Sequence, residues 1–155
     1  MKNHNDILNK LAIRTITYFD ENLNLNIQNE FTIKNVSKID YLDISTHISL
    51  SNDIIGTAGM SISNELAYKM VKNFVFGDLT KDELISLSSE NLAETLNIIL
   101  GNILQDLEII KNGGKVEITT PNTKQEKVTI TNENDTMYLC ELKLDNEIIL
   151  LSYFE

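Results

Sequence analysis

Hydrophobic positions along the chain change their spacing several times, and each change predicts a different element. Over residues 5–21, apolar side chains recur three and four positions apart, which is typical of an amphipathic helix. In the middle of the chain and toward its end the spacing becomes two, as in strands with one buried face. The predicted strands are a weak one within 25–36, a pair at 40–50 and 54–62 joined by a turn at 51–53, and four later ones at 116–118, 128–130, 138–144 and 148–152.

Two further helical regions are predicted between these strands. Ser63 is a favourable N-cap for a helix that Gly77 would end. Residues 80–83 have the spacing of a capping box, which would open a short turn or helix. A long helix follows from about residue 88 to residue 111, where the glycines at 113–114 stop it.

The order of these elements predicts an α+β fold in which an antiparallel sheet packs against long helices. The closing strands are too close together for helical crossovers, and Asp145-Asn146 suits a two-residue hairpin turn. A helix followed by a strand set occurs twice, which suggests pseudo-duplicated halves. No low-complexity linker divides the sequence, so we expect residues 1–155 to form a single domain.

Composition and charge narrow the classes of partner. The chain is 42% hydrophobic and carries 23 acidic against 13 basic residues, for a net charge of −10. Nucleic-acid binders neutralise phosphates with a basic face, and anionic membrane surfaces attract polybasic segments. No Lys/Arg cluster is present. We therefore expect neither a nucleic acid nor a membrane as partner, and the acidic charge favours proteins with exposed lysines.

The single cysteine and the apolar runs bear on compartment. Cys140 alone can form no intrachain disulfide, and its alternation with Tyr138 and Leu142 is typical of a core-facing strand residue. Residues 1–6 lack the apolar core of a signal peptide. The longest apolar run, residues 148–151, is too short to span a bilayer. We expect a cytoplasmic protein.

The predicted long helix carries the most informative pattern in the chain. Glu94, Asn97 and Gly101 are three and four positions apart and therefore lie on one polar face. Asn97 falls at the margin of the apolar arc, where core packing would hold one flank of its side chain. Glycine costs about 1 kcal/mol against alanine inside a helix, and the close approach of another molecule would explain Gly101. The helix would then present an acid and an amide in a fixed mutual geometry.

Spacing alone does not establish a function for this pair. In a chain so rich in glutamate and asparagine, Glu-x-x-Asn is expected by chance about once or twice. It recurs at residues 21–24, where a loop is predicted. A polar helix face with glutamates on it is usually solvated and has no further role.

Other catalytic chemistries lack the residues they need. His4 is near the N-terminus and His47 lies within a predicted strand, so neither a histidine triad nor a histidine metal site is supported. The glycines at 113–114 follow a helix, whereas a Walker-type phosphate loop precedes one. Gly56 and Gly59 lie inside a strand and indicate a bulge or a close backbone approach. We expect this chain to hold no metal and no cofactor.

The helix motif is part of a longer ordered pattern. Upstream, a glycine-bearing strand leads into a helix that ends at a glycine, and downstream the only proline follows a strand; the residues are Gly56, Gly59, 60–63, 65–67, Gly77, and Pro121 after 116–120. Together with Glu94-x-x-Asn97-x-x-x-Gly101-Asn102, this order resembles the CheX branch of the CheC–CheX–FliY family of chemotaxis phosphatases.

The resemblance implies a phosphatase that acts on a phosphorylated CheY-type response regulator. Asn97 would orient the attacking water in line with the aspartyl phosphate, and Glu94 would pair with the regulator's active-site lysine. Glu90, Ile98 and Gly101 are expected to contact the regulator, which would itself bring the Mg²⁺. An amide suits the role because it accepts from water and donates without adding charge, and phosphoryl transfer depends chiefly on positioning and charge stabilisation.

One active site per chain is expected. Relatives with two sites repeat Glu-x-x-Asn in the first helix, where this chain has only Asp6-Ile7-Leu8-Asn9, with Ile13 in place of the glycine. CheC-type sites carry Asp or Ser four residues before the glutamate, and this chain has Glu90 there. The resemblance also implies a homodimer formed through the sheet.

A competing hypothesis is a non-catalytic module on the same fold. Such a domain would bind the regulator, as parts of the flagellar switch do, without hydrolysing its phosphate. The presence of both Glu94 and Asn97 argues for the enzyme. A third possibility is a dimeric structural protein whose polar helix face is simply solvated.

Overall fold

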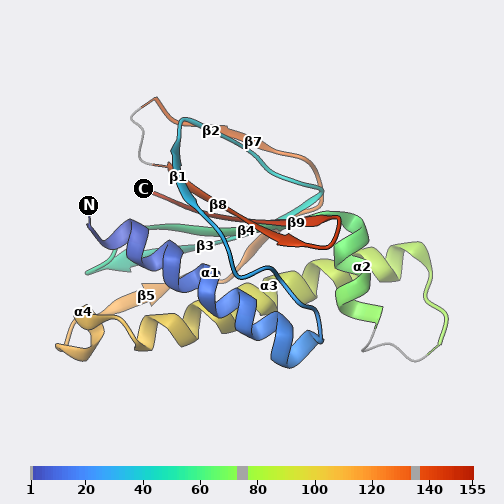
Figure 1. Cartoon of the computed structure of the whole chain (residues 1–155), viewed down its shortest axis with the longest axis horizontal. Coiled ribbons are helices and arrows are strands. Elements are labelled where there is room, and N and C mark those ends of the chain that lie inside the picture. The colour runs from blue at the N-terminus through green and yellow to red at the C-terminus, as the bar shows by residue number, and fades with distance from the viewer. Residues whose placement is uncertain (1, 73–76, 134–136) are drawn as a thin grey trace.

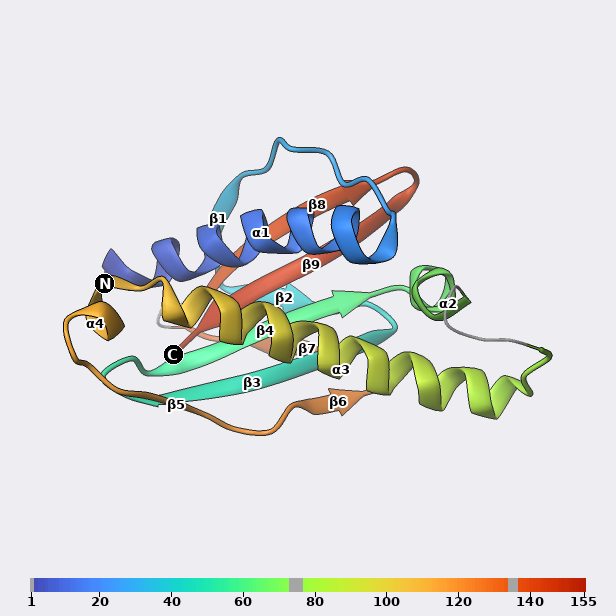
Figure 2. The same cartoon turned by 90° about the horizontal axis from the view of Figure 1, so that it is seen from below.

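A computed structural model describes residues 2–72, 77–133 and 137–155 of the chain (Figure 1). Two long helices cover one face of an antiparallel sheet (Figure 2). The helices are α1 (Lys2–Leu23), α2 (Asn64–Lys72), α3 (Lys81–Gln105) and α4 (Glu108–Lys111). The strands are β1 (Ile33–Val36), β2 (Lys38–Asp40), β3 (Ile44–Asn52), β4 (Gly56–Ile62), β5 (Val116–Ile118), β6 (Asn122–Lys124), β7 (Thr129–Thr131), β8 (Met137–Leu144) and β9 (Glu147–Phe154).

The main sheet has seven strands in the order β1-β8-β9-β4-β3-β5, and β6 also pairs with β3. Every pairing in it is antiparallel. Two hairpins, β3–β4 and β8–β9, form the centre, and Asp145 turns the second one with a left-handed φ of 51°. The predicted α+β class with an antiparallel sheet and long helices is confirmed.

The core lies between the sheet and the two long helices. Alternate positions of the central strands are buried toward the helices, as Ile44, Ile48 and Leu50 are in β3. Cys140 belongs to this core, as its alternation predicts, and burial, followed by the charge of Glu141, raises the pKa of its thiol to about 11. Helix α1 packs against β8 and β9, and α3 packs against β3 and α2.

The opposite face of the sheet is partly covered by a ribbon formed by β2 and β7 (Figure 1). A smaller apolar cluster of Ile39, Tyr41 and Met137 joins this ribbon to the sheet. Strands β2 and β6 are absent from the sequence prediction because β2 has one apolar residue and β6 has none, so neither shows an alternation of apolar and polar positions. Of the strand predicted within 25–36, only Ile33–Val36 forms, at the sheet edge.

The long helix differs from its prediction at both ends. It begins at Lys81 because the capping box is real: Glu83 N–H donates to Thr80 Oγ1 at 3.2 Å, and Thr80 N–H donates to Glu83 Oε2 at 3.0 Å. It ends at Gln105, and residues 108–111 form the separate short helix α4. The first two turns are missing from the predicted long helix because residues 86–89 are rich in serine, which is a weak helix former.

The predicted N-cap of the middle helix is confirmed. Leu66 N–H donates to Ser63 Oγ at 3.1 Å, and Ser63 Oγ donates to Glu147 Oε2 at 2.6 Å. The helix is described as far as Lys72, and the expected Phe74 and Val75 lie outside the described residues. The first helix is confirmed, with bounds close to those predicted.

The two strand glycines allow a close approach, and the ladder register runs through both without a bulge. A Cβ at Gly59 would overlap Ser152 Oγ and would lie 2.8 Å from His47 Cδ2. A Cβ at Gly56 would overlap the Tyr153 ring. Glycine is therefore required by side chains of the neighbouring strands, which is the close-approach alternative of the sequence prediction.

Candidate functional site

The outward face of α3 gathers all the residues that the sequence singled out. Glu90 and Glu94 are exposed, whereas Asn97 and Gly101 are half-buried. Ile98 is 36% exposed, which is high for an isoleucine in the middle of a packed helix. Glu94, Asn97 and Gly101 share one face of the helix, as their spacing predicts, and the role of all five residues stays a prediction.

The rotation of α3 about its axis is fixed by its buried face. Leu92, Leu96 and Leu100 are fully buried in the core beneath it. One flank is also tied to the chain beyond β6, since Gln125 Nε2 donates to Ser89 Oγ at 2.5 Å. Asn97 thus sits on a rigid element at the margin of the core, and part of its side chain is held by packing.

The functional groups of the pair are free of internal partners. Neither Glu94 nor Asn97 has a hydrogen bond or an ion pair to any of the residues that the structure describes. Because the exposed carboxylate and the half-buried amide have no internal bonds, both can form polar contacts with a second molecule. This arrangement suits recognition of a partner's cation and positioning of a small polar group beside it.

Gly101 has no internal reason to be glycine. A Cβ built on it would meet nothing within 4 Å, and its φ is not in the left-handed region. This differs from Gly59, whose neighbours exclude a side chain. The space above Gly101 is therefore open, as a surface approached by another molecule requires.

The imperfect motif of the first helix does not reproduce the α3 site. Asp6 and Asn9 are exposed on α1, but the next turn carries Ile13, which is 51% exposed, at the position that corresponds to Gly101 in the α3 motif. Within the described part of the chain, no three His, Cys, Asp or Glu side chains cluster as metal ligands would. The supply of Mg²⁺ by a partner stays a prediction.

His47 lies away from α3, on the sheet face that the β2–β7 ribbon covers. Its ring stacks edge-on against Tyr41 at a centroid distance of 4.9 Å and lies 6.2 Å from the ring of Phe154. Burial, with a smaller effect of the nearby Lys124 charge, lowers the pKa of His47 to about 4. The imidazole is neutral at pH 7 and takes no part in the α3 site. The side chain of His4 lies outside the described residues.

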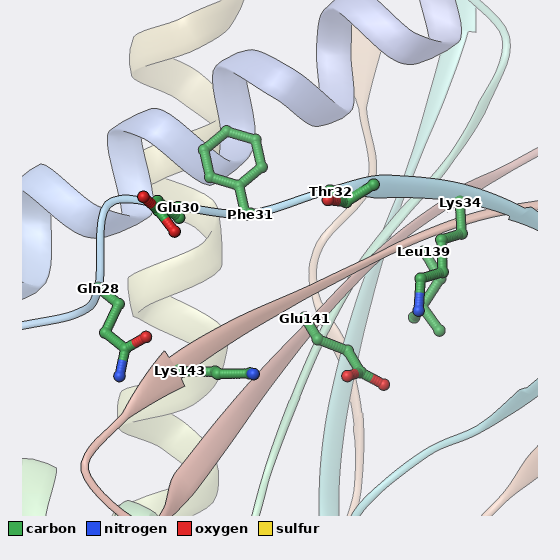
Figure 3. A pocket seen from close by; sticks show the side chains of 8 residues that line it. All are labelled: Gln28, Glu30, Phe31, Thr32, Lys34, Leu139, Glu141 and Lys143. Carbon is green, nitrogen blue, oxygen red and sulfur yellow. The ribbon is translucent and has the colours of Figure 1, made fainter.

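A separate cavity of about 310 Å³ opens at the β1–β8 edge of the sheet (Figure 3). Its charged side chains are two glutamates and two lysines: Glu30, Lys34, Glu141 and Lys143. These charges balance, so the cavity has no net attraction for a ligand of either sign. It contains none of the predicted site residues.

Among the described helices, none has the length and apolar character that a membrane span requires.

The fold defines an α+β protein with an antiparallel sheet, and its long helix α3 presents the exposed Glu94 and the half-buried Asn97 on one face. The family model described as "Chemotaxis phosphatase CheX" matches residues 44–142, which include β3, α3 and the site. The chain belongs to the CheX family, as its motif order predicts. A search among curated proteins finds no match.

Solved structures share the fold at low sequence identity. The chemotaxis protein CheX from Desulfovibrio desulfuricans is 13% identical with a TM-score of 0.74, over 97% of this chain and 99% of that one. A CheC-like superfamily protein from Shewanella sp. PV-4 is 14% identical with a TM-score of 0.74, over 96% of both chains. A match in the CheX–CheY–BeF3–Mg²⁺ complex from Borrelia burgdorferi is 19% identical with a TM-score of 0.73, over 94% and 95%.

Proposed function

We propose that this chain hydrolyses the aspartyl phosphate of a phosphorylated CheY-type response regulator. The observation that carries the proposal is the pair on α3: an exposed Glu94 and a half-buried Asn97, both without internal partners, in a chain of the CheX family. The Borrelia burgdorferi complex supports the choice of partner, because a protein of the same fold there accompanies CheY with BeF3 and Mg²⁺.

Asn97 acts by positioning a water. Its carboxamide oxygen accepts a hydrogen bond from the water, while its N–H₂ group donates to an oxygen of the phosphoryl group. The water is thereby held in line with the bond from phosphorus to the aspartate oxygen, which breaks. Holding a reactant near its attack geometry can lower the barrier by several kcal/mol, and no charge is added beside an anionic group.

Glu94 anchors the complex. It lies one turn before Asn97 on the same face, so a regulator lysine paired with it is held beside the amide. Docking removes water from the pair, which strengthens the attraction relative to an exposed ion pair. We further propose that Mg²⁺ belongs to the regulator, with Glu90, Ile98 and Gly101 contacting the regulator's surface.

The test follows loss of phosphate from a phosphorylated CheY-type regulator of the same organism. We expect the wild-type chain to accelerate this loss, and Asn97→Ala to reduce turnover at saturation by about 100-fold or more with the fold retained. Glu94→Gln should instead weaken association by about tenfold or more. Asn9→Ala is the matched control: it removes an exposed helical amide from the imperfect motif of α1 and should leave turnover unchanged.

Two outcomes would contradict the proposal. No acceleration with any of the organism's regulators would exclude the phosphatase activity. Regulator binding with a phosphate lifetime that does not respond to Asn97→Ala would favour the non-catalytic module.

A further inference from the structure

The helical layer exposes two isoleucines on the side of the molecule that carries the site. Ile13 of α1 is 51% exposed and Ile98 of α3 is 36% exposed. Other exposed large hydrophobic residues of the described chain lie on strands or turns, as Ile55 does at 65%. Each isoleucine leaves part of its apolar surface in water, and a second surface that covers this part would explain both positions.

The helical positions show on which side of Glu94 and Asn97 these isoleucines lie. With Asn97 at zero and about 100° per residue, Ser89 lies near −80° and Asp106 near 180°. Ser89 bonds to Gln125 beyond β6, and Asp106 lines the cleft toward α1. Ile98, at about 100°, therefore lies between Glu94 and α1. In Figure 2, α1 and β6 are on opposite flanks of α3.

A groove continues from this side into the gap between the two helices. It has a volume of about 280 Å³ and is lined by Lys10, Ile13, Arg14, Thr17, Ile103 and Asp106. Arg14 Nε is buried and has no hydrogen-bond acceptor among the described residues. Lys10 and Arg14 have no ion-pair partner there either. Among the described residues, the charges of Lys10 and Arg14 are thus unpaired in a chain of net charge −10.

Stable protein interfaces are large, so a partner docked at Asn97 can also reach this groove. A standard interface covers about 800 Å² on each protein, whereas a helix with its side chains is only about 10–12 Å wide. Neighbouring packed helices lie about 8–10 Å apart. A regulator seated on α3 must therefore also cover a neighbour of α3, and the exposed isoleucines favour α1.

The charge of the groove matches the partner. A regulator that holds Mg²⁺ does so with carboxylates, so the surface around its phosphorylation site is acidic. Against such a surface most of this chain is repulsive, because it carries 23 acidic residues. Lys10 and Arg14 carry the opposite charge and line the groove between α1 and α3. Arginine is suited to this role because its planar fork binds carboxylates in a bidentate manner.

We propose that the α1–α3 groove is the second half of the regulator-docking surface: Ile13 and Ile98 make the apolar contact, and Arg14, with Lys10, pairs with carboxylates of the regulator. This inference rests on the proposed function. It also gives a role to the turn of α1 where the catalytic motif is missing, since Ile13 replaces the expected glycine with an apolar anchor.

The experiment measures affinity and turnover separately. Binding is measured with a CheY-type regulator of the same organism carrying beryllofluoride and Mg²⁺, and turnover with the phosphorylated form at saturation. We expect Ile13→Ser and Arg14→Gln each to weaken binding about fivefold or more while the turnover at saturation is kept. Ile13→Val should bind as the wild type does. Ile55→Ser, which removes a more exposed isoleucine that does not line the groove, is the matched control and should change neither quantity.

The outcomes separate this inference from the proposed function. If the wild-type chain removes phosphate and both Ile13→Ser and Arg14→Gln bind normally, the groove is not part of the docking surface and the phosphatase proposal stands. If the wild-type chain removes no phosphate, the proposed function itself fails. If Ile13→Ser changes the oligomeric state of the protein in solution and not its affinity for the regulator, the groove is an interface between copies of this chain. The inference is then overturned.

Discussion

At the scale of single residues, two glycines show opposite reasons for the absence of a side chain. Gly59 is glycine because Ser152 and His47 occupy the space that a Cβ would need. Gly101 is glycine although its surroundings are empty and its backbone is ordinary helix. The first residue serves the fold. The second lowers helix stability and is explained only by something outside the chain.

Gly101→Ala is therefore expected to separate stability from function. Alanine should raise the free energy of unfolding by about 0.5–1 kcal/mol, because it restricts the unfolded chain and meets no clash in the helix. The same methyl group should weaken regulator binding several-fold by holding the two surfaces apart. Chemical denaturation and a binding titration measure the two effects.

Gly113→Ala provides a control with the opposite sign. Its surroundings are equally open, but its φ of 90° is unfavourable for alanine, so it should destabilise by about 1 kcal/mol. A Gly101→Ala variant that is less stable than the wild type, or that binds the regulator unchanged, would contradict the interpretation of Gly101 as an approach point.

At the scale of elements, α3 is a long helix whose two parts have different tasks. Its middle, around Asn97, is held between the sheet, α1 and α2. Its first turns extend beyond the sheet edge (Figure 2) and depend on the Thr80–Glu83 capping box. About 25 Å of helix separates Thr80 from Asn97 at 1.5 Å per residue. The ends and the site of this helix can therefore be perturbed independently.

Thr80→Ala should lower stability by about 1 kcal/mol, since it leaves the Glu83 N–H without its side-chain acceptor. Amide hydrogen exchange should accelerate in the first turn of α3 and stay unchanged around Asn97, and the turnover of phosphorylated regulator should be kept. Thr80→Ser preserves the hydroxyl and should behave as the wild type. Faster exchange that reaches Asn97 would show that the helix responds as one unit.

At the scale of the whole molecule, the sheet separates two environments. The helical face carries the main core and the candidate site, and the opposite face carries His47 beneath the β2–β7 ribbon. His47 contacts the aromatic rings of Tyr41 and Phe154 on this face, and Gly59 leaves room for its ring. A charge on this imidazole would affect the stability of the fold and leave the α3 site unaltered.

The pH dependence of stability follows from this burial. The pKa of His47 falls from 6.5 to about 4 in the folded state, because burial disfavours the charged ring and Lys124 adds to the effect. Between these values the unfolded chain binds the proton more tightly, so the contribution is complete above pH 6.5 and is lost as the pH falls toward 4. It amounts to at most about 3 kcal/mol.

Denaturant unfolding of the wild type and of His47→Gln at pH 7, 5.5 and 4.5 measures the contribution of His47 to the free energy of unfolding. The wild type should lose more stability than the variant on acidification, because the titrating carboxylates are common to both. Parallel losses would show that His47 is protonated as easily in the folded protein as in the unfolded chain.

Elements whose signals are local in the chain could be predicted without a structure. Periods of 3.6 and two, the Ser63 N-cap and the Asp145-Asn146 turn each depend on interactions among near neighbours in the chain, and each was predicted. The sequence also placed Glu94, Asn97 and Gly101 on one helix face, since helical geometry alone fixes their relation. The family order of glycines and proline then supplied the expected partner.

Which polar groups have no internal partner, and which residues lie beside them, could not be predicted before the chain was seen folded. The emptiness above Gly101, the crowding around Gly59 and the groove between α1 and α3 all depend on segments far apart in the chain. The short strand β6 pairs with the longer β3, and β2 pairs with β7, which is equally short and distant in the sequence. Local patterns fix helix faces and turns, but the packing of one face against another is set by the whole fold, because burial is a property of all the surfaces that meet.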